Sequence, residues 1–557
     1  MERVLRDPRA PLAGLALAMV ASATWLLLAG RGNGLHGDEL FYYAHLVGND
    51  GITSALHGLE YLLAPHNAHL VFGGRIAYEV LLDLGGATDY TVFRVVEVLG
   101  ILLCAGLFFA SARRGLEPWV ALAMSISLLT LGYANETLMW GFDLHTVYAA
   151  ALGVAAILLL ERAERRADVF ACLLLVVSVA TLEVGLAFTI GAAVSVLLRA
   201  ERVRRLWIFV LPLALYVAWW AWAKKFGQSD IELSNVKLIP HEFVEALSAV
   251  VGSVLGINSS PEAAFVGTTP AATVAAGFAL AGLAYRVRRG AVPPALWAFL
   301  ATALAYWLTM AMGGRAPDST RYVFVGTLLV LLVAAEAMKG VRFSPLAIGG
   351  FFVVVALAIP PNVAKLNDGK GFEIREAKIN GAEYAMLDLA GSNRAGEGYL
   401  PGDDPAVEAA GGNVGVGLDT GHYFEGSAEY GGLGMPLDQL RSADVPLRNI
   451  ADATLVGAYG LQLLPRSAPA RASTCPAVDD ATSEDVAYFK LEPGGVLLGA
   501  RSAPVEVSLS RFTGGLPGVA LGRILPGHWA AVSIPTDAAQ DPWRAVVNGP
   551  VAVCPLP

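Results

Sequence analysis

Long apolar runs alternate with short polar segments over the first 360 residues, a pattern typical of helices that cross a membrane. Most runs approach the roughly 20 residues that a spanning helix needs. The pattern therefore predicts about eleven spans. Two of them, joined by Thr181-Leu182-Glu183, are short, and a partly re-entrant hairpin is the alternative interpretation there. The runs lie at 11–29, 90–112, 117–133, 144–161, 168–182, 184–199, 205–223, 265–285, 291–312, 321–338 and 344–360.

Basic residues gather in one alternate set of loops, all of them short, together with the N-terminus. Lys and Arg favour the cytoplasmic side of a membrane. The pattern predicts a cytoplasmic N-terminus and, after an odd number of crossings, an extracytoplasmic C-terminal part at the plasma (inner) membrane. The loops at 30–89 and 224–264 then lie outside, and their amphipathic segments predict helices along the membrane surface.

The pattern changes after Pro360-Pro361. We expect a transmembrane domain at 1–360, a mixed region at 361–470 and a β-rich domain at 471–557. Within the mixed region, 391–435 is rich in Gly and acidic residues, which predicts irregular structure. From about residue 483, short alternating runs separated by Gly and Pro favour an antiparallel β-sandwich.

Composition supports a polytopic α-helical membrane protein, since 55% of the residues are hydrophobic and 16% are charged. The net charge of −9 comes from residues 361–557, which hold 14 Lys and Arg against 23 Asp and Glu. No basic face is available to neutralise phosphates, so nucleic-acid binding is excluded. Cys475 and Cys554 bracket the last stretch, where an oxidising compartment would favour a disulfide; two unpaired thiols are the alternative.

Two adjacent carboxylates, Asp38 and Glu39, follow the first span directly, with His36 before them and Tyr42 after them. Ionised acids at the edge of a membrane domain cost free energy unless water solvates them or a cation pairs with them, so an acid kept there otherwise has a functional role. The functional interpretation is a catalytic or binding site. The plain interpretation is a pair of solvated loop acids, or a helix N-cap at Asp38.

The pattern D-E-x-x-Y-x-A, formed by Asp38, Glu39, Tyr42 or Tyr43, and Ala44, resembles the first-loop motif of GT-C fold glycosyltransferases. That class includes protein O-mannosyltransferases, aminoarabinose transferases and arabinofuranosyltransferases. The resemblance implies a sugar donor carried on polyprenyl phosphate and an acid that acts as general base on the acceptor hydroxyl. It assigns the base to Asp38, and gives Glu39 the role of orienting the site or binding a divalent cation.

Five of the nine histidines lie between residues 36 and 69. His66 and His69, three residues apart, would share one face of a helix and bind a metal or the acceptor. Glu60 precedes them, and an interfacial residue bonded to backbone is the plain alternative for each histidine. Further candidates for substrate binding are Trp140, which would stack on a sugar, and Glu183, at the outer end of the short hairpin.

Arg321 and Tyr322 open a span after an external loop that also contains Arg315. Their place resembles that of late-loop arginines which hold the donor phosphate in GT-C enzymes. A forked, permanently charged guanidinium suits a phosphodiester. Lys224 is a further candidate for the same role. The alternative is that these side chains reach lipid headgroups by snorkelling.

Together these features predict a membrane glycosyltransferase that transfers a sugar, with inversion, to a glycan, lipid or protein acceptor of the cell envelope. By similarity to arabinofuranosyltransferases, the C-terminal domain would be a carbohydrate-binding domain. Two rivals remain. A transporter or flippase also carries charges in its spans, and a non-catalytic envelope scaffold would not need Asp38.

Overall fold

The computed structural model describes residues 7, 9–49, 52–227, 231–290, 292–413, 417–469, 472, 475–478, 487–515 and 518–556. The chain forms two compact units. The first comprises Met1–Asn33, Leu46–Gly85 and Asp89–Glu373, and the second comprises Gly34–His45, Gly86–Thr88 and Ile374–Pro557. The short segment around Asp38 thus belongs to the second unit, although it directly follows the first apolar helix.

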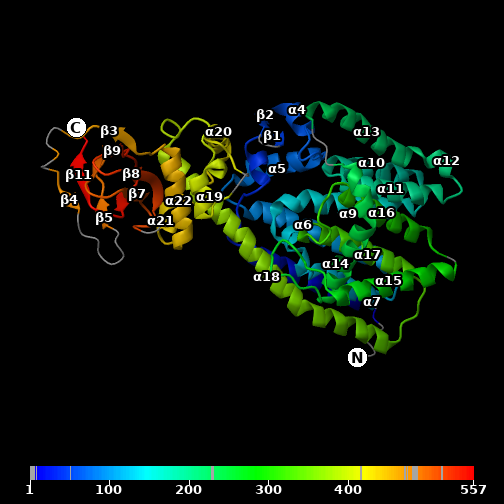
Figure 1. The fold of residues 1–557 in the computed structure, drawn as a ribbon. Helices are drawn as coiled ribbons and strands as arrows, with labels where there is room; N and C mark the ends of the chain where they lie inside the picture. Colours follow the sequence, from blue (N-terminus) through cyan, green and yellow to red (C-terminus); the bar gives the residue numbers. More distant parts are fainter. Residues whose placement is uncertain are drawn as a thin grey trace. The chain divides into compact units, whose positions relative to one another are not determined.

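Helices form at all eleven predicted runs (Figure 1). In the described part of the chain, nine helical segments are long and apolar enough to cross a membrane, and eight of them match predicted runs. The ninth, Leu233–Leu255, contains the segment expected along the membrane surface. The helices in the order of the eleven runs are α2 (Ala10–Ala29), α6 (Thr91–Ala112), α7 (Pro118–Leu129), α9 (Leu144–Leu160), α10 (Arg165–Thr181), α11 (Val184–Leu197), α13 (Trp207–Ala223), α15 (Pro270–Arg288), α16 (Pro294–Met312), α17 (Thr320–Ala337) and α18 (Pro345–Ala390).

The first unit contains the apolar helices and is called the membrane unit below. Small residues let its central helices approach closely. Helix α9 packs against α10 and α11, and α11 packs against α16. A Cβ atom at Gly153 would lie 2.1 Å from the Phe188 ring, and one at Gly191 would lie 2.0 Å from the Thr302 hydroxyl. Close contact of this kind replaces the hydrophobic driving force that helices lack in lipid.

The turn between α10 and α11 is also tight. Leu182 is extended, with φ −163° and ψ 157°, and Glu183 follows before α11 begins. A Cβ at Gly185 would lie 2.4 Å from the backbone of Ser178, so the return of the chain requires glycine there. This turn fixes the position of Glu183.

The long loop at 30–89 contains short elements rather than helices alone. An antiparallel hairpin, β1 (Leu46–Asn49) and β2 (Ile52–Ala55), precedes the helices α4 (Gly58–Leu63) and α5 (Phe72–Gly85). The segment at 224–264, which was predicted to lie outside, contains the 3₁₀ helices η3 (Lys224–Phe226) and η4 (Leu233–Leu238), and then α14 (Ile239–Leu255). Between α7 and α9 lie η1 (Gly132–Ala134), α8 (Asn135–Met139) and η2 (Gly141–Asp143). Helix α12 (Arg202–Arg205) precedes α13.

Helix α18 runs without a break through Pro360 and Pro361 (Figure 1). Each proline removes one backbone donor from a helix. The change in composition nevertheless does not end the helix, and the compact units divide between Glu373 and Ile374 rather than after residue 360.

The second unit contains helices where irregular structure was expected. Within 391–435 the structure has η5 (Pro401–Asp403), α19 (Pro405–Ala410) and α20 (Thr420–Tyr430). Asp404 and Asp419 accept hydrogen bonds from the backbone N–H groups of Ala406 and His422, and so cap α19 and α20. The prediction was wrong because the Gly-rich composition concealed these caps. The short helix α3 (Glu39–Tyr43) precedes this region, and α21 (Leu437–Arg441) and α22 (Val445–Ala458) follow it.

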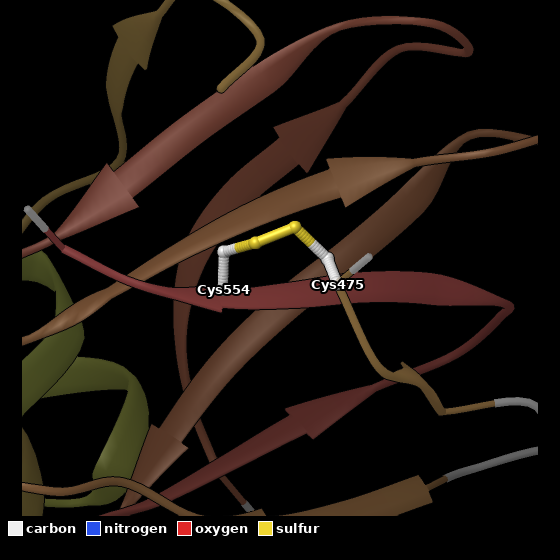
Figure 2. Close-up of a disulfide and its surroundings, with 2 residues drawn as sticks. All are labelled: Cys475 and Cys554. Atoms are coloured by element: carbon white, nitrogen blue, oxygen red, sulfur yellow. A yellow bond between two sulfur atoms is a disulfide. The ribbon is translucent and has the colours of Figure 1, made fainter. Parts of the chain in front are cut away.

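Two antiparallel sheets complete the second unit, in the order β5-β10-β7-β8 and β3-β9-β6-β11-β4. The alternating runs correctly predicted this β-rich end, although residues 483–486 lie outside the described residues. Cys475 and Cys554 form a disulfide that ties β11 to the segment leading into β4 (Figure 2). The strands are β3 (Leu464–Arg466), β4 (Ala477–Val478), β5 (Ala487–Lys490), β6 (Val496–Ala500), β7 (Val505–Ser510), β8 (Val519–Ile524), β9 (Trp529–Val532), β10 (Arg544–Val547) and β11 (Val551–Pro555).

Candidate functional site

The paired acids at 38 and 39 have different surroundings. Glu39 is fully buried, and its Oε2 accepts a hydrogen bond of 3.1 Å from the backbone N–H of His36. The Nδ1 of His36 donates to the carbonyl oxygen of Gly34 at 2.8 Å. Asp38 is half-buried and stands at the N-cap position of α3, but its side chain makes no capping hydrogen bond. Glu39 therefore holds the local backbone, and Asp38 is the more accessible acid.

The segment that carries these acids is anchored within the second unit. Tyr43 donates a hydrogen bond of 2.9 Å to the carbonyl oxygen of Gly431, at the end of α20. Its ring also fills the space beside Gly426, where a Cβ would lie 2.5 Å from a ring carbon. Tyr42, a predicted substrate contact, is fully buried. Packing thus fixes the backbone that carries Asp38.

His66 and His69 do not share a helix face as predicted. They end a four-residue turn, in which each backbone N–H donates to the other's carbonyl oxygen, at 3.0 and 2.9 Å. Asn67 and Ala68, with φ values of 47° and 66°, occupy the left-handed region inside this turn. The turn overrides the helical spacing. Within the described ranges, no group of three or more His, Cys, Asp and Glu residues could hold a metal ion.

His69 instead connects two distant parts of the membrane unit. Its Nδ1 lies 2.7 Å from Oε2 of Glu183, and its Nε2 lies 3.4 Å from a guanidinium nitrogen of Arg315. Because a carboxylate only accepts, Nδ1 carries the proton given to Glu183. Burial by itself would raise the pKa of Glu183, but the charge and hydrogen bond of His69 lower it below its ordinary value. Glu183 therefore orients the histidine as a carboxylate.

A small cavity of about 60 Å³ lies beside this group. Its lining includes three predicted residues, His69, Glu183 and Lys224, and two that sequence analysis missed, Tyr216 and Trp219. Trp219 donates to the carbonyl oxygen of Leu63 at 2.7 Å, and the Lys224 ammonium lies 3.8 Å from the Trp220 ring centre. The run of tryptophans at the end of α13 was the available signal, but an interfacial aromatic belt gives the same pattern.

Arg321 forms a second charged group. Its Nε lies 2.9 Å from Oε1 of Glu136 and 3.9 Å from Oδ1 of Asp143, and its guanidinium lies 4.6 Å from the Trp140 ring centre. Thr137 donates to Asp143 at 2.9 Å. Burial raises the pKa of Glu136 above its ordinary value, although Arg321 acts to lower it. Trp140, which was predicted to stack on a sugar, contacts Arg321, which was predicted to bind the donor phosphate.

Two further predicted residues have more ordinary surroundings. Glu60, on α4, pairs with Lys225 at 2.7 Å, and both side chains are about half exposed. Tyr322, at the start of α17, is half-buried and lines a small cavity beneath α14 and α16. Its carbonyl oxygen accepts a hydrogen bond of 3.3 Å from Tyr306. The structure therefore groups His69, Glu183, Lys224 and Arg315, and leaves Glu60 in an exposed ion pair.

Two solved glycosyltransferases are similar to the chain. One is ArnT from Cupriavidus metallidurans, solved bound to undecaprenyl phosphate, with a TM-score of 0.42 and 15% identity over 67% of this chain and 80% of that one. The other is the Archaeoglobus fulgidus oligosaccharyltransferase in the apo form, with a TM-score of 0.41 and 12% identity over 68% of this chain and 58% of that one. No protein-family model matches the chain, and no curated protein matches its sequence.

Proposed function

We propose that the chain is an integral membrane glycosyltransferase of the GT-C type, which transfers a sugar from a polyprenyl-phosphate donor to a hydroxyl group of a cell-envelope acceptor. The observation that carries the proposal is the cationic group of the membrane unit. Arg315 contacts His69, Arg321 contacts Glu136, and Lys224 lines the cavity beside the first pair. Arg315 lies in the short segment between α16 and α17, and Arg321 is the second residue of α17.

The donor phosphate would bind to Arg321 and Arg315, with Lys224 and Tyr322 as further contacts. A phosphodiester and a carboxylate present similar acceptor oxygens to a guanidinium. The Arg321 side chain is 27% exposed, and its partner Glu136 is 18% exposed. An incoming phosphate would therefore compete with a carboxylate for a cation that still has access to solvent.

Asp38 is the proposed general base. It would accept the proton of the acceptor hydroxyl, while the hydroxyl oxygen forms a bond to C1 of the sugar. The bond from C1 to the phosphate oxygen breaks, and its electron pair leaves with polyprenyl phosphate. A single displacement inverts the configuration at C1 and needs no covalent enzyme intermediate. Glu39, held by the His36 backbone, keeps Asp38 in position.

The reaction would take place on the extracytoplasmic face of the membrane, with the N-terminus in the cytoplasm. The alternation of basic loops supports this orientation. The disulfide between Cys475 and Cys554 independently suits an oxidising compartment for the second unit. The β-rich region there would hold the acceptor glycan.

A transfer assay with a panel of polyprenyl-phosphate sugars tests the proposal, by comparing the wild type with Asp38→Asn. We expect turnover to fall by about 10²–10⁴-fold, because a general base contributes about that much. Asp83→Asn is the matched control, since Asp83 is an exposed acid on α5. Equal turnover in the Asp38 variant would reject the base. Lipid translocation by the wild type, without transfer of any sugar, would favour a flippase.

A further inference from the structure

A large apolar groove lies between α14, α15, α16 and α17 in the membrane unit. Its volume is about 730 Å³, which falls within the range of about 300–1,000 Å³ that is typical of ligand sites. Aliphatic and aromatic side chains line most of it, among them Leu247, Leu280, Leu304 and Val330. The groove exists because α15 packs against α14 but hardly against α16 and α17. As a result 11% of its apolar window is buried, compared with 50% for α16 and 67% for α17.

One end of the groove is basic. Its lining contains two charged residues, and both are arginines, Arg286 and Arg289. Arg286 is held by the carbonyl oxygens of Ala337 and Gly290, at 3.0 and 2.7 Å. Arg289 lies over the Tyr285 ring, 4.5 Å from its centre. A cationic end on an apolar groove complements a lipid with a negatively charged headgroup.

This basic end lies on the opposite side of the membrane from the candidate donor site. Arg286 and Arg289 precede α16, and Arg315 follows it. The 19 residues of α16 span about 28 Å at 1.5 Å per residue, close to the thickness of a bilayer's hydrocarbon core. A donor with its phosphate at Arg315 or Arg321 would place its headgroup in one leaflet. A lipid with its phosphate at Arg289 would belong to the other.

We infer that the groove binds an anionic glycerophospholipid of the leaflet opposite the donor, with its acyl chains along α15 and its headgroup at Arg286 and Arg289. This lipid is separate from the polyprenyl-phosphate substrate. It fills the space that α15 leaves open, and so completes the packing of that helix against α16 and α17.

The glycines of α15 allow a direct test. A Cβ atom added at Gly277 or Gly282 would meet no heavy atom within 4 Å, although both residues line the groove. Leucine at either position therefore fills space meant for the acyl chains, and its Cβ meets no protein atom outside its own helix backbone. Gly349, on α18, has equally open surroundings and does not line the groove. Gly349→Leu is thus a control with the same change in size and hydrophobicity.

The full-length protein, delipidated in detergent, is titrated with phosphatidylglycerol and, separately, phosphatidylcholine, and native mass spectrometry counts the bound lipids. We expect the wild type and Gly349→Leu to bind one phosphatidylglycerol with the same affinity. Gly277→Leu and Gly282→Leu should weaken that binding about tenfold, since each displaces a few methylene groups of the lipid. Size-exclusion elution and the thermal midpoint establish that each variant is folded.

Arg289→Gln tests the charge. It should reduce the preference for phosphatidylglycerol over phosphatidylcholine by about fivefold, the effect of one basic residue at a lipid surface. Unchanged binding in both groove variants would overturn the inference, as would an equal loss for both lipids in Arg289→Gln. Competition by undecaprenyl phosphate for the same single site would also overturn it, because the groove would then hold the donor's chain. The readout is bound lipid, so the result does not depend on sugar transfer.

Discussion

Arg511 in the second unit and Arg321 in the membrane unit both face carboxylates and a tryptophan ring, but their surroundings differ. The Arg511 side chain is 3% exposed, and its two terminal nitrogens lie 2.5 and 2.7 Å from the oxygens of Asp537. Two backbone carbonyl oxygens accept its remaining hydrogen bonds, at 3.0 and 3.1 Å. The Arg321 side chain is 27% exposed, and its Nε lies 2.9 Å from Oε1 of Glu136 and 3.9 Å from Oδ1 of Asp143.

The difference distinguishes an arginine that stabilises the fold from one whose carboxylate partner a ligand can replace. A bidentate pair that is buried and further bonded to backbone carbonyls is fixed in one geometry, and removing one member leaves a buried charge without compensation. A partly exposed arginine loses less when a ligand replaces its acid, because water already screens the pair. Substitution at Arg511 should therefore change stability, and substitution at Arg321 should change catalysis.

The largest effect is expected from Arg511→Ala. The variant leaves the Asp537 carboxylate buried, and should lose about 3–5 kcal/mol of unfolding free energy. Denaturant titration of the second unit's transition in the purified protein measures this loss. Adding Asp537→Ala should restore part of the stability, because the unpaired charge is then removed. If the single variant unfolds at the wild-type denaturant concentration, the pair is not structural.

Arg321→Met should reduce kcat/KM for the polyprenyl-phosphate donor by about 10²–10³-fold, comparable to losing one donor to a developing charge. The unfolding free energy should change by less than about 1 kcal/mol, since the lost pair is partly solvated. Steady-state transfer kinetics and thermal unfolding measure the two quantities. Lys225→Met is the control, because Lys225 forms an exposed pair with Glu60. A large loss of stability with normal kinetics would assign Arg321 the structural role of Arg511.

The sequence predicted the helices well because an apolar run of sufficient length has few alternatives in a membrane. It also located the β-rich end, through alternation between turns. It failed at 391–435, where capping by Asp404 and Asp419 outweighs glycine content. The change of composition at Pro360-Pro361 does not mark the end of a helix, since α18 continues through both prolines.

The candidate site was predictable as a set of residue types, but not as an arrangement. His69 and Glu183 are 114 residues apart and pair only because two turns bring them together. The spacing of His66 and His69 suggested a helix face, whereas the left-handed residues between them form a turn. This turn contains no glycine, the residue that most often occupies left-handed backbone conformations. Long-range pairs and unusual backbone conformations leave no periodic signal in a single sequence.

A fall in pH should gradually weaken the ion pair between Arg511 and Asp537. Burial would raise the pKa of Asp537, but the hydrogen bonds and charge of Arg511 lower it below its ordinary value. A lowered folded-state pKa stabilises the protein above the unfolded pKa of about 4, and this stability is lost as pH falls through the folded value.

The expected slope from this one group is at most about 1.4 kcal/mol per pH unit. Unfolding free energies of the wild type and Asp537→Asn, measured between pH 6 and pH 2 (roughly the range in which carboxylates titrate), should converge as pH falls. A constant difference between the two proteins across this range would contradict the assignment.

The smallest effect is expected at Arg523, which pairs with Glu506 across β7 and β8 at 3.2 Å. Both side chains are more than half exposed, so water and salt screen their attraction and the side chains lose entropy by pairing. Arg523→Ala should therefore change the unfolding free energy by no more than about 0.5 kcal/mol. Arg523→Ala is measured beside Arg511→Ala in the same titration. Both variants remove an arginine from the second unit, but only Arg511 is buried, so the comparison isolates the effect of burial. If the two variants lost equal stability, burial would not be what distinguishes the structural pair.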